Sequence, residues 1–235
     1  MALIAGRADA SAERAPAPPP PPIVVLDPGH GGSNTGAKGA GLDEKRLTLA
    51  LAHRVAGRLR ARGIDVRLTR ADDRTLTLRQ RVDAANRAPA DVFVSIHANA
   101  SISRSQRGFE TYVLTARGVD VDGRALRGDT PTPRPGVDPE IALVLDDVER
   151  GASQWGAAEL AARMQRALRD RRGASGDRGV RQDVHHVLLG ATMPAVLVEV
   201  GFLDHPLEGK ELAAPNIQDQ LADAIAEAIT DQLAD

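Results

Sequence analysis

The sequence predicts a layered α/β domain built around one core. Short, unbroken apolar runs at residues 23–26, 92–96 and 195–200 have the length and β-branched content of buried strands. Stripes of apolar residues at helical spacing lie between and after these runs, at 43–62 and 217–233. Strands that alternate with helices are typical of a sheet covered by helices.

The domain is expected to begin at Ile23. Residues 1–22 are rich in Ala and Pro and end in the run Pro18 to Pro22. Proline has no backbone N–H to donate to a helix or sheet, so this stretch is predicted to be an extended, disordered linker. The length of 235 residues allows one sizeable core, which we place over residues 23–235.

The remaining elements follow in order along the chain. Leu47, Leu51, Val55 and Leu59 are four residues apart and form the apolar stripe of the first helix, which Gly63 stops. The other elements expected are strands at 64–68 and 109–114, and helices at 76–87, 138–150 and 153–171. Residues 115–137 show no periodicity and many Gly, Pro, Asp and Arg, so a long surface loop or insertion is predicted there.

Composition excludes several classes of function. The 30 Lys and Arg nearly balance the 32 Asp and Glu, so nothing in the net charge of −2 favours nucleic acid as a partner. The chain has no cysteine, which leaves His, Asp and Glu as the strong metal ligands. No apolar run approaches the roughly 18 residues of a membrane span, and the first five residues are too short for a signal-peptide core of roughly 7 to 15 residues.

Chemistry-bearing side chains gather where strands end. His30 follows the first strand, His97 ends the strand at 92–96, and Glu199 lies near the end of the last strand, an edge where α/β sheets usually bind ligands. Glu44 begins the first helix, where the loop that carries His30 can bring it alongside. Two histidines and one carboxylate can hold a tetrahedral zinc with a position left for water, and a second carboxylate can then serve as base.

Each of these signals is weak when taken alone, since a lone loop histidine is more often a surface or hydrogen-bonding residue. The glycines at 29, 31 and 32 could make a turn, and the Gly-Lys-Ser/Thr ending of a phosphate loop is missing. His53, within the first helix, is expected at the surface. His185 and His186 are adjacent, so at most one of them is expected to face a substrate groove.

The combination of four motifs is more informative than any single residue. In order along the chain they are Asp27-Pro28-Gly29-His30-Gly31-Gly32, Gly41 to Glu44-Lys45, Ser95-Ile96-His97-Ala98-Asn99, and Met193 to Leu203. Together they resemble the zinc-dependent N-acetylmuramoyl-L-alanine amidases, cell-wall hydrolases of the Amidase_3 type. The resemblance runs from about Ile23 to Leu233. It implies a single domain with a central, mainly parallel or mixed sheet of about six strands flanked by helices.

The resemblance also implies the site and the reaction. Its zinc ligands fall on His30, Glu44 and His97, for one Zn²⁺ per chain, and its catalytic glutamate falls on Glu199. The implied reaction is hydrolysis of the amide bond between N-acetylmuramic acid and L-alanine in peptidoglycan, for cell-wall remodelling, cell separation or lysis. A periplasmic or extracellular protein, acting as a monomer, is then expected. His205 departs from the small polar residue expected at its position.

Further expectations depend on the same resemblance. Residues 115–150 form a candidate insertion or regulatory segment, because the stretch from Ile141 to Glu149 is apolar and acidic like the segment that blocks the zinc in autoinhibited members. An ordinary packed helix is the simpler interpretation. An activator protein is a candidate partner. Two other functions stay open: another zinc peptidase of the cell wall, such as a carboxypeptidase, and a wall-binding module without turnover.

Overall fold

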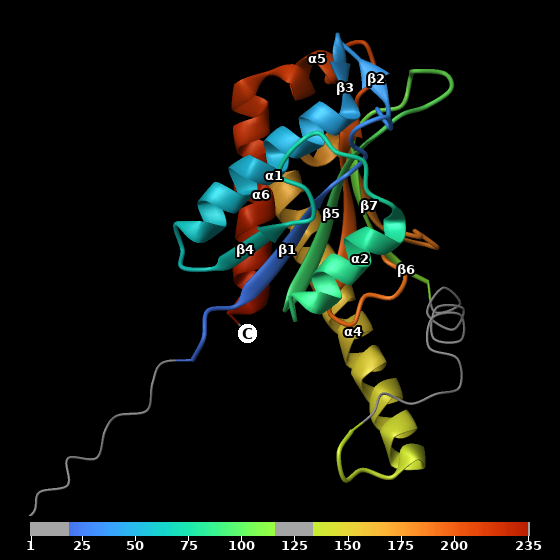
Figure 1. Ribbon diagram of the computed structural model, residues 1–235. Helices are drawn as coiled ribbons and strands as arrows, with labels where there is room; N and C mark the ends of the chain where they lie inside the picture. The colour runs from blue at the N-terminus through green and yellow to red at the C-terminus, as the bar shows by residue number, and fades with distance from the viewer. Residues whose placement is uncertain (1–18, 116–133, 235) are drawn as a thin grey trace, which may run out of the picture.

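The computed structural model describes residues 19–115 and 134–234 (Figure 1). The predicted linker therefore falls largely outside the described residues, as does most of the predicted loop at 115–137. The strands are β1 Ile23–Pro28, β2 Lys38–Gly39, β3 Leu42–Asp43, β4 Asp65–Leu68, β5 Val92–Asn99, β6 Phe109–Leu114, β7 Asp177–Asp183 and β8 Ala195–Phe202. The helices are α1 Glu44–Arg60, α2 Leu78–Arg87, α4 Pro139–Arg172, η1 Ala174–Gly176, α5 Glu208–Ala213 and α6 Pro215–Leu233.

Six of these strands form one mixed sheet, in the order β4-β1-β5-β8-β6-β7. Strands β4, β1, β5 and β8 are parallel to one another. β6 runs antiparallel to β8, and β7 runs parallel to β6. The structure confirms the predicted single α/β domain with a mainly parallel, mixed sheet flanked by helices.

Helices cover the two faces of this sheet unequally. α1, α4 and α6 pack on one face around a large core that includes Val24, Val94 and Val196. α2 and the segment before β8 cover part of the other face, around a smaller core that includes Phe93 and Leu197. Successive residues of a strand face opposite sides of the sheet. Because both faces are covered along β5 and β8, these strands consist of unbroken apolar runs. The thinner covering leaves the end of the second face open.

Two predictions about elements differ from the structure. The helices predicted at 138–150 and 153–171 are one helix, α4 Pro139–Arg172, which continues through Gly151 because a glycine lowers the stability of a helix by only about 1 kcal/mol. The edge strand β7 was not predicted, since it is largely exposed and polar and therefore lacks an apolar run. Among the helices that the structure describes, none combines the length and apolarity needed to cross a bilayer.

Candidate metal centre

The loop after β1 has an unusual backbone that fixes the position of His30. Gly29 donates from its N–H to the Ile96 carbonyl of β5 over 2.9 Å, and His30 itself has a positive φ of 59°. The Nδ1 of His30 lies 3.0 Å from the Oδ1 of Asn34, which fixes the ring. Its Nε2 lies 3.0 Å from Glu44 Oε2.

Two buried arginines hold this loop from beneath. Arg81, on α2, donates to Asp27 Oδ1 (2.7 Å) and to the carbonyls of Pro28 (2.8 Å) and His30 (2.6 Å). Arg70 is fully buried and donates to the carbonyls of Pro28 (2.9 Å) and Gly29 (2.7 Å). Because buried carbonyls need partners, these guanidinium groups stabilise a loop that has few backbone partners of its own.

Glu44 is the centre of the group. It is the first residue of α1 and is 4% exposed. Its Oε1 lies 3.0 Å from the Nδ1 of His97 and accepts from the N–H of Ala98 over 3.0 Å. Its Oε2 faces His30 and accepts from the N–H of Ala37 over 2.8 Å. The two backbone donors leave the carboxylate little freedom to rotate away from the histidines.

Glu44, His30 and His97 can together hold a metal ion. One ligand atom from each lies within 4.8 Å of the others. Bonds of about 2.0–2.2 Å to a tetrahedral zinc place its ligands roughly 3.4 Å apart, so this donor set needs only small side-chain shifts to fit the ion. The close approach of the loop to β5 requires a glycine at position 29, because a Cβ there would lie 2.6 Å from the Nε2 of His97.

The charges of the group support one another. Burial opposes ionisation of Glu44, but hydrogen bonds from both histidines hold the pKa of its carboxyl well below the usual value. Burial also opposes the charged form of His30, yet the hydrogen bond to Glu44 and the charge of that carboxylate raise the pKa of His30 above 6.5. A cation at this position would take over the favourable interaction that protonated histidine makes here.

Glu199 lies beside this group on the neighbouring strand. It pairs in register with His97 across the parallel strands β5 and β8. Its Oε2 is buried and has no hydrogen-bond partner among the described residues. Burial raises the pKa of Glu199 well above 4.5, and the nearby carboxylates of Glu44 and Glu110 raise it further. The site therefore contains a carboxyl group that has a raised affinity for a proton and one oxygen, Oε2, without a partner among the described residues.

The other histidines have local roles. The ring of His53 is exposed and hydrogen-bonds the Ala71 carbonyl, as expected for a surface residue. His205 accepts from the N–H groups of Leu207 and Glu208 at the start of α5, so the departure from the family pattern is compatible with the turn. Of the adjacent pair, His185 is partly buried against the ring of Tyr112, with centroids 4.4 Å apart, while His186 is exposed.

Sequence reasoning missed one charged cluster next to the site. Glu110, 2% exposed, lies directly opposite Glu199 on β6 and pairs with Arg178 and Arg181 of β7. Asn99, the last residue of β5, also donates to Glu110 over 2.9 Å. The available signal was a lone glutamate in the otherwise uncharged strand 109–114, but its partners lie about 70 residues away on a strand that was not predicted.

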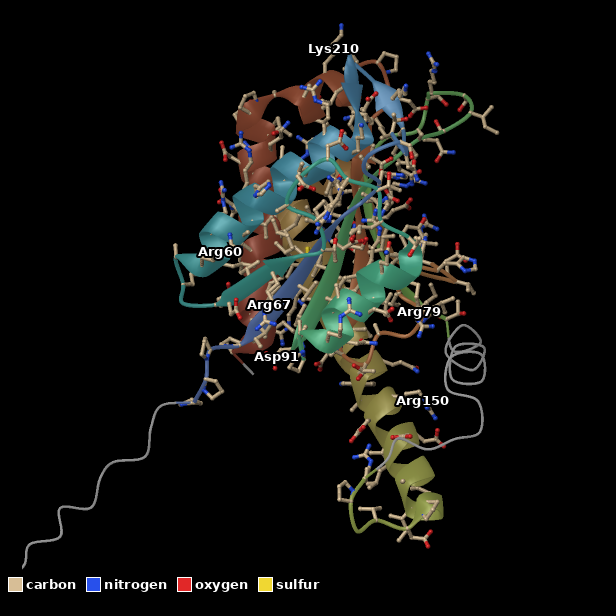
Figure 2. The ribbon with its side chains drawn as sticks, in the orientation of Figure 1. Arg60, Arg67, Arg79, Asp91, Arg150 and Lys210 are labelled. Atoms are coloured by element: carbon tan, nitrogen blue, oxygen red, sulfur yellow. The ribbon has the colours of Figure 1, made fainter. Side chains whose placement is uncertain are left out.

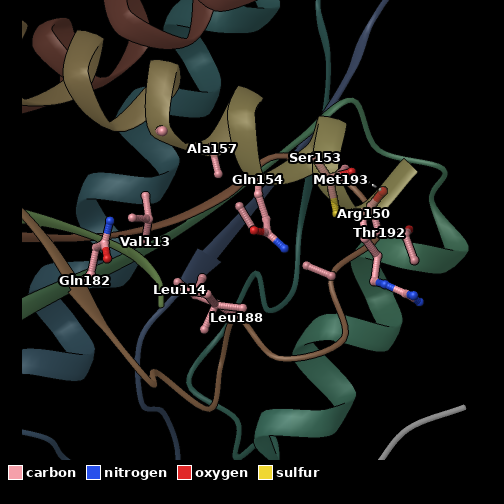
Figure 3. Close-up of a pocket in the computed structure, with 13 residues that line it drawn as sticks. Val113, Leu114, Arg150, Ser153, Gln154, Ala157, Gln182, Leu188, Thr192 and Met193 are labelled. Atoms are coloured by element: carbon pink, nitrogen blue, oxygen red, sulfur yellow. Dashed lines mark hydrogen bonds between the residues drawn. The ribbon is translucent and has the colours of Figure 1, made fainter. Parts of the chain in front are cut away.

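A separate cavity of about 210 Å³, lined by both apolar and polar side chains, lies at the other end of β8 (Figure 3). Its lining includes Ala157, Leu188 and Met193, and it reaches Ala195, the first residue of β8, whereas Glu199 is near the end of that strand. None of its described lining residues is a His, Asp or Glu. It therefore offers no metal ligand or acid–base group.

The described C-terminal part of the candidate regulatory segment, residues 134–150, reaches this same end, where Arg150 lines the cavity. Residues 139–150 begin α4, which extends beyond the sheet (Figure 1). Within the described residues, Arg134 binds Asp146 over 3.0 Å and Glu149 over 2.8 Å. Neither acid belongs to the set His30, Glu44 and His97, which we call the metal-binding group. The simpler interpretation of an ordinary packed helix does not describe this stretch either, because Ile141, Val144 and Val148 are exposed. A regulatory role of residues 115–150 stays a prediction, and residues 116–133 lie outside the described part of the chain.

Comparison with known proteins places this geometry in a family. The model of the Amidase_3 family, N-acetylmuramoyl-L-alanine amidase, matches residues 24–231, which is most of the chain. The chain belongs to this amidase family. The match spans the loop after β1, the start of α1, the end of β5 and the end of β8, which are the segments that carry the metal-binding group and Glu199.

Individual amidases agree with that assignment. AmiA of Escherichia coli K12 is 33% identical over 216 residues, which cover 88% of this chain and 74% of that protein. The solved structure of AmiC2 of Nostoc punctiforme is similar at a TM-score of 0.70, with 30% identity over 91% of this chain and 98% of that chain. An amidase from Clostridium difficile 630 gives a TM-score of 0.71 at 28% identity, over 92% of this chain and 98% of that chain.

Proposed function

We propose that this protein is a zinc-dependent N-acetylmuramoyl-L-alanine amidase that cuts the amide bond between N-acetylmuramic acid and L-alanine in peptidoglycan. The observation that carries the proposal is the His30–Glu44–His97 group beside Glu199, whose buried Oε2 has no partner among the described residues. Membership of the amidase family supports the choice of substrate. Action on peptidoglycan in the cell envelope, outside the cytoplasm and as a monomer, is part of the same proposal.

In this proposal His30, Glu44 and His97 hold one zinc ion. The fit rests on the donor set, two imidazole nitrogens and a carboxylate oxygen within 4.8 Å of one another, which is a set that zinc enzymes use. When bound, zinc supplies Lewis acidity, lowering the pKa of a water molecule towards about 7 and polarising an amide carbonyl. The N–H groups of Ala37 and Ala98 orient the Glu44 carboxylate, so the protein fixes the ligand before the ion arrives.

Glu199 is the proposed proton carrier. Its raised pKa makes its carboxylate a strong base for the proton of the attacking water. The same carboxyl can hold that proton and return it to the nitrogen of L-alanine when the amide bond breaks, so one group acts first as base and then as acid. Its Oε2 has no hydrogen bond to a described residue that would have to break first.

The test is hydrolysis of purified peptidoglycan by the zinc-loaded protein. The proposal expects new L-alanine amino termini and no new reducing sugar ends, and it expects activity and about one zinc per chain to be lost together on chelation. Release of a C-terminal residue of the stem peptide would instead indicate a carboxypeptidase. Stoichiometric zinc without hydrolysis would indicate a wall-binding module.

The variant Glu199→Gln distinguishes a catalytic base from a zinc ligand. Glutamine keeps the size of the side chain but removes the basic carboxylate, so zinc content and thermal stability should stay close to those of the unmodified protein while turnover falls by roughly 10² to 10⁴-fold. The matched comparison is His97→Ala, which should lower zinc content as well as turnover. If Glu199→Gln loses its zinc, Glu199 is a ligand and Glu44 becomes the candidate base.

A further inference from the structure

We propose that Arg178 and Arg181 form a subsite that binds a free carboxylate of the stem peptide, close to the bond that is cut. This inference rests on the proposed function and adds a feature of the substrate, an acidic residue next to L-alanine. Four observations carry it: a row of side chains that leads from the metal-binding group, the way Glu110 holds the arginines, a groove at that place, and the length of peptide that fits the distance.

A row of side chains crosses four neighbouring strands on one face of the sheet. His97 on β5 is in register with Glu199 on β8, and Glu199 is in register with Glu110 on β6. Residues in register on paired strands point to the same face. Arg178 on β7 continues the row, since its Nε lies 3.0 Å from Glu110 Oε2. The metal-binding group and this arginine are therefore parts of one continuous surface.

Glu110 anchors the arginines rather than binding substrate. Its Oε1 accepts from Asn99 Nδ2 over 2.9 Å and from the hydroxyl of Tyr112 over 3.0 Å, while its Oε2 faces the Nε atoms of Arg178 (3.0 Å) and Arg181 (3.2 Å). Both oxygens thus have two partners each. Because each arginine uses its Nε for Glu110, the terminal amino groups stay available for a second carboxylate.

The terminal groups of the two arginines differ in what holds them. Arg178 Nη2 donates to Gln106 Oε1 over 3.1 Å, its Cζ lies 5.0 Å from the centre of the Phe202 ring, and its Nη1 has no hydrogen-bond partner among the described residues. Arg181 is bound to Glu110 only through Nε, and 49% of its side chain is exposed. The two guanidinium groups thus share a single carboxylate, that of Glu110.

An open groove lies at the same place. It has a volume of about 530 Å³ and is lined by the loop from Ala100 to Ser103 together with Asn99, Gln106, Glu110, Tyr112, Arg178 and Phe202. Asn99 is two residues after His97 in β5, so this strand connects the groove with the metal-binding group, although His30, Glu44, His97 and Glu199 do not line the groove themselves. Its floor is polar and partly aromatic, which suits an extended peptide better than a lipid or an apolar helix.

Distance decides which part of the substrate can reach the arginines. Neighbouring strands are about 4.8 Å apart, so the guanidinium of Arg178, which reaches back to Glu110, lies roughly 5–10 Å from Glu199 along the row. An extended chain advances about 3.3–3.6 Å per residue. With the scissile amide beside Glu199, the residue that follows L-alanine brings its carboxylate to the arginines. The stem peptide thus lies towards β6 and β7, and the sugar lies on the opposite side of the metal.

The experiment compares two synthetic substrates on the zinc-loaded protein. One is N-acetylmuramoyl-L-alanyl-glutamate with free carboxylates, and the other carries carboxamides in their place. The unmodified protein should show a kcat/KM about tenfold higher for the acid, mostly through KM, as expected for a partly exposed charge-assisted contact. Arg178→Gln should bring this ratio close to one, and Arg181→Gln should lower it partially. Both substrates are measured on one preparation, so a loss of folded protein leaves the ratio unchanged.

The matched control is Arg67→Gln. Arg67 lies on β4, the opposite edge strand of the sheet, and is likewise paired with a carboxylate, that of Asp65, at 3.0 Å (Figure 2). Its ratio should equal that of the unmodified protein. A ratio of one in the unmodified protein, or an unchanged ratio in Arg178→Gln, would overturn the inference.

A binding measurement separates this inference from the proposed function. Calorimetric titration of both substrates into the zinc-loaded Glu199→Gln protein requires no turnover. Tighter binding of the acid, lost when Arg178→Gln is added, supports the subsite even if neither substrate is hydrolysed, in which case the proposed function alone fails. Equal binding of acid and carboxamide overturns the subsite even if both substrates are hydrolysed.

Discussion

Replacing Gly36 by alanine tests whether the backbone around Glu44 is shaped for metal binding. Gly36 has a φ of +65°, and a Cβ at this position would overlap Glu44 Oε2 and lie 2.6 Å from Cδ2 of His30. Gly41, in the turn between β2 and β3, has a similar φ of +75°, but its Cβ position meets open space. The two alanine variants share the backbone cost and differ in whether the new methyl group displaces a metal ligand.

The expected magnitudes follow from this difference. A left-handed alanine costs about 1–2 kcal/mol of unfolding free energy in either variant. Gly36→Ala adds about 1–3 kcal/mol for overpacking, because the Glu44 carboxylate is fixed by two backbone donors and cannot simply turn away. Displacing that ligand should also weaken zinc binding by about 10 to 100-fold, the usual effect of disturbing the support of a metal site.

Two measurements check the prediction. Denaturant unfolding of the metal-free proteins gives the stabilities, and competition with a chelator gives the zinc affinities. Gly41→Ala should lose stability but bind zinc as the unmodified protein does, while Gly36→Ala should lose both. Equal zinc affinity in the two variants would refute the view that Gly36 is needed for the ligand geometry.

Two further predictions concern the loop and the charges of the site. Asp27→Ala should lower the unfolding free energy by about 3–5 kcal/mol in denaturant titration, because it leaves the buried Arg81 without its carboxylate; a loss below 1 kcal/mol would show that the carbonyl partners suffice. In the metal-free protein, the lowered pKa of Glu44 gives stability above about pH 4.5 that is lost as the pH falls, and the raised pKa of His30 gives stability below about pH 6.5 that is lost as the pH rises. Unfolding between pH 3 and 9 should therefore show the largest stabilising effect of the group between about pH 4.5 and 6.5. Glu44→Gln should flatten that maximum, and an unchanged profile would contradict the role of the pair.

The thinly covered face of the sheet explains why the polar residues of the site gather at the carboxyl end of β5 and β8. His97, Glu199 and Glu110 lie on the same face as Phe93 and Leu197, where α2 is the main covering helix. Beyond the end of α2, the strands present polar side chains to the surface instead of a core. The same strands bury apolar residues on the other face under three helices, α1, α4 and α6.

The exposed apolar residues at the start of α4 have no equivalent explanation. Ile141, Val144 and Val148 are 57%, 62% and 62% exposed, and Trp155, two turns further along α4, is 72% exposed. They follow helical spacing and so lie along one side of the helix. This side is far from the metal-binding group, and nothing in the described residues covers it.

Sequence by itself determined the elements whose hydrophobic pattern is strong. The buried strands β1, β5 and β8 were predicted from unbroken apolar runs, and α1 and α6 from apolar stripes, because these patterns reflect burial directly. Three of the four candidate site residues lie at strand ends, which meet at one edge of a parallel sheet, and the resemblance to the amidases assigned a role to each of the four.

Only the tertiary structure decided how these residues are held and what surrounds them. The partners of Glu110 come from β5 and β7, and those of the loop after β1 come from Arg70 and Arg81, contacts between segments that no local pattern relates. β7 is a polar edge strand whose pairing depends on β6 already being in place. Periodicity records whether a side chain is buried; which polar side chain meets which depends on register and crossover connections, and these exist only once the sheet has formed.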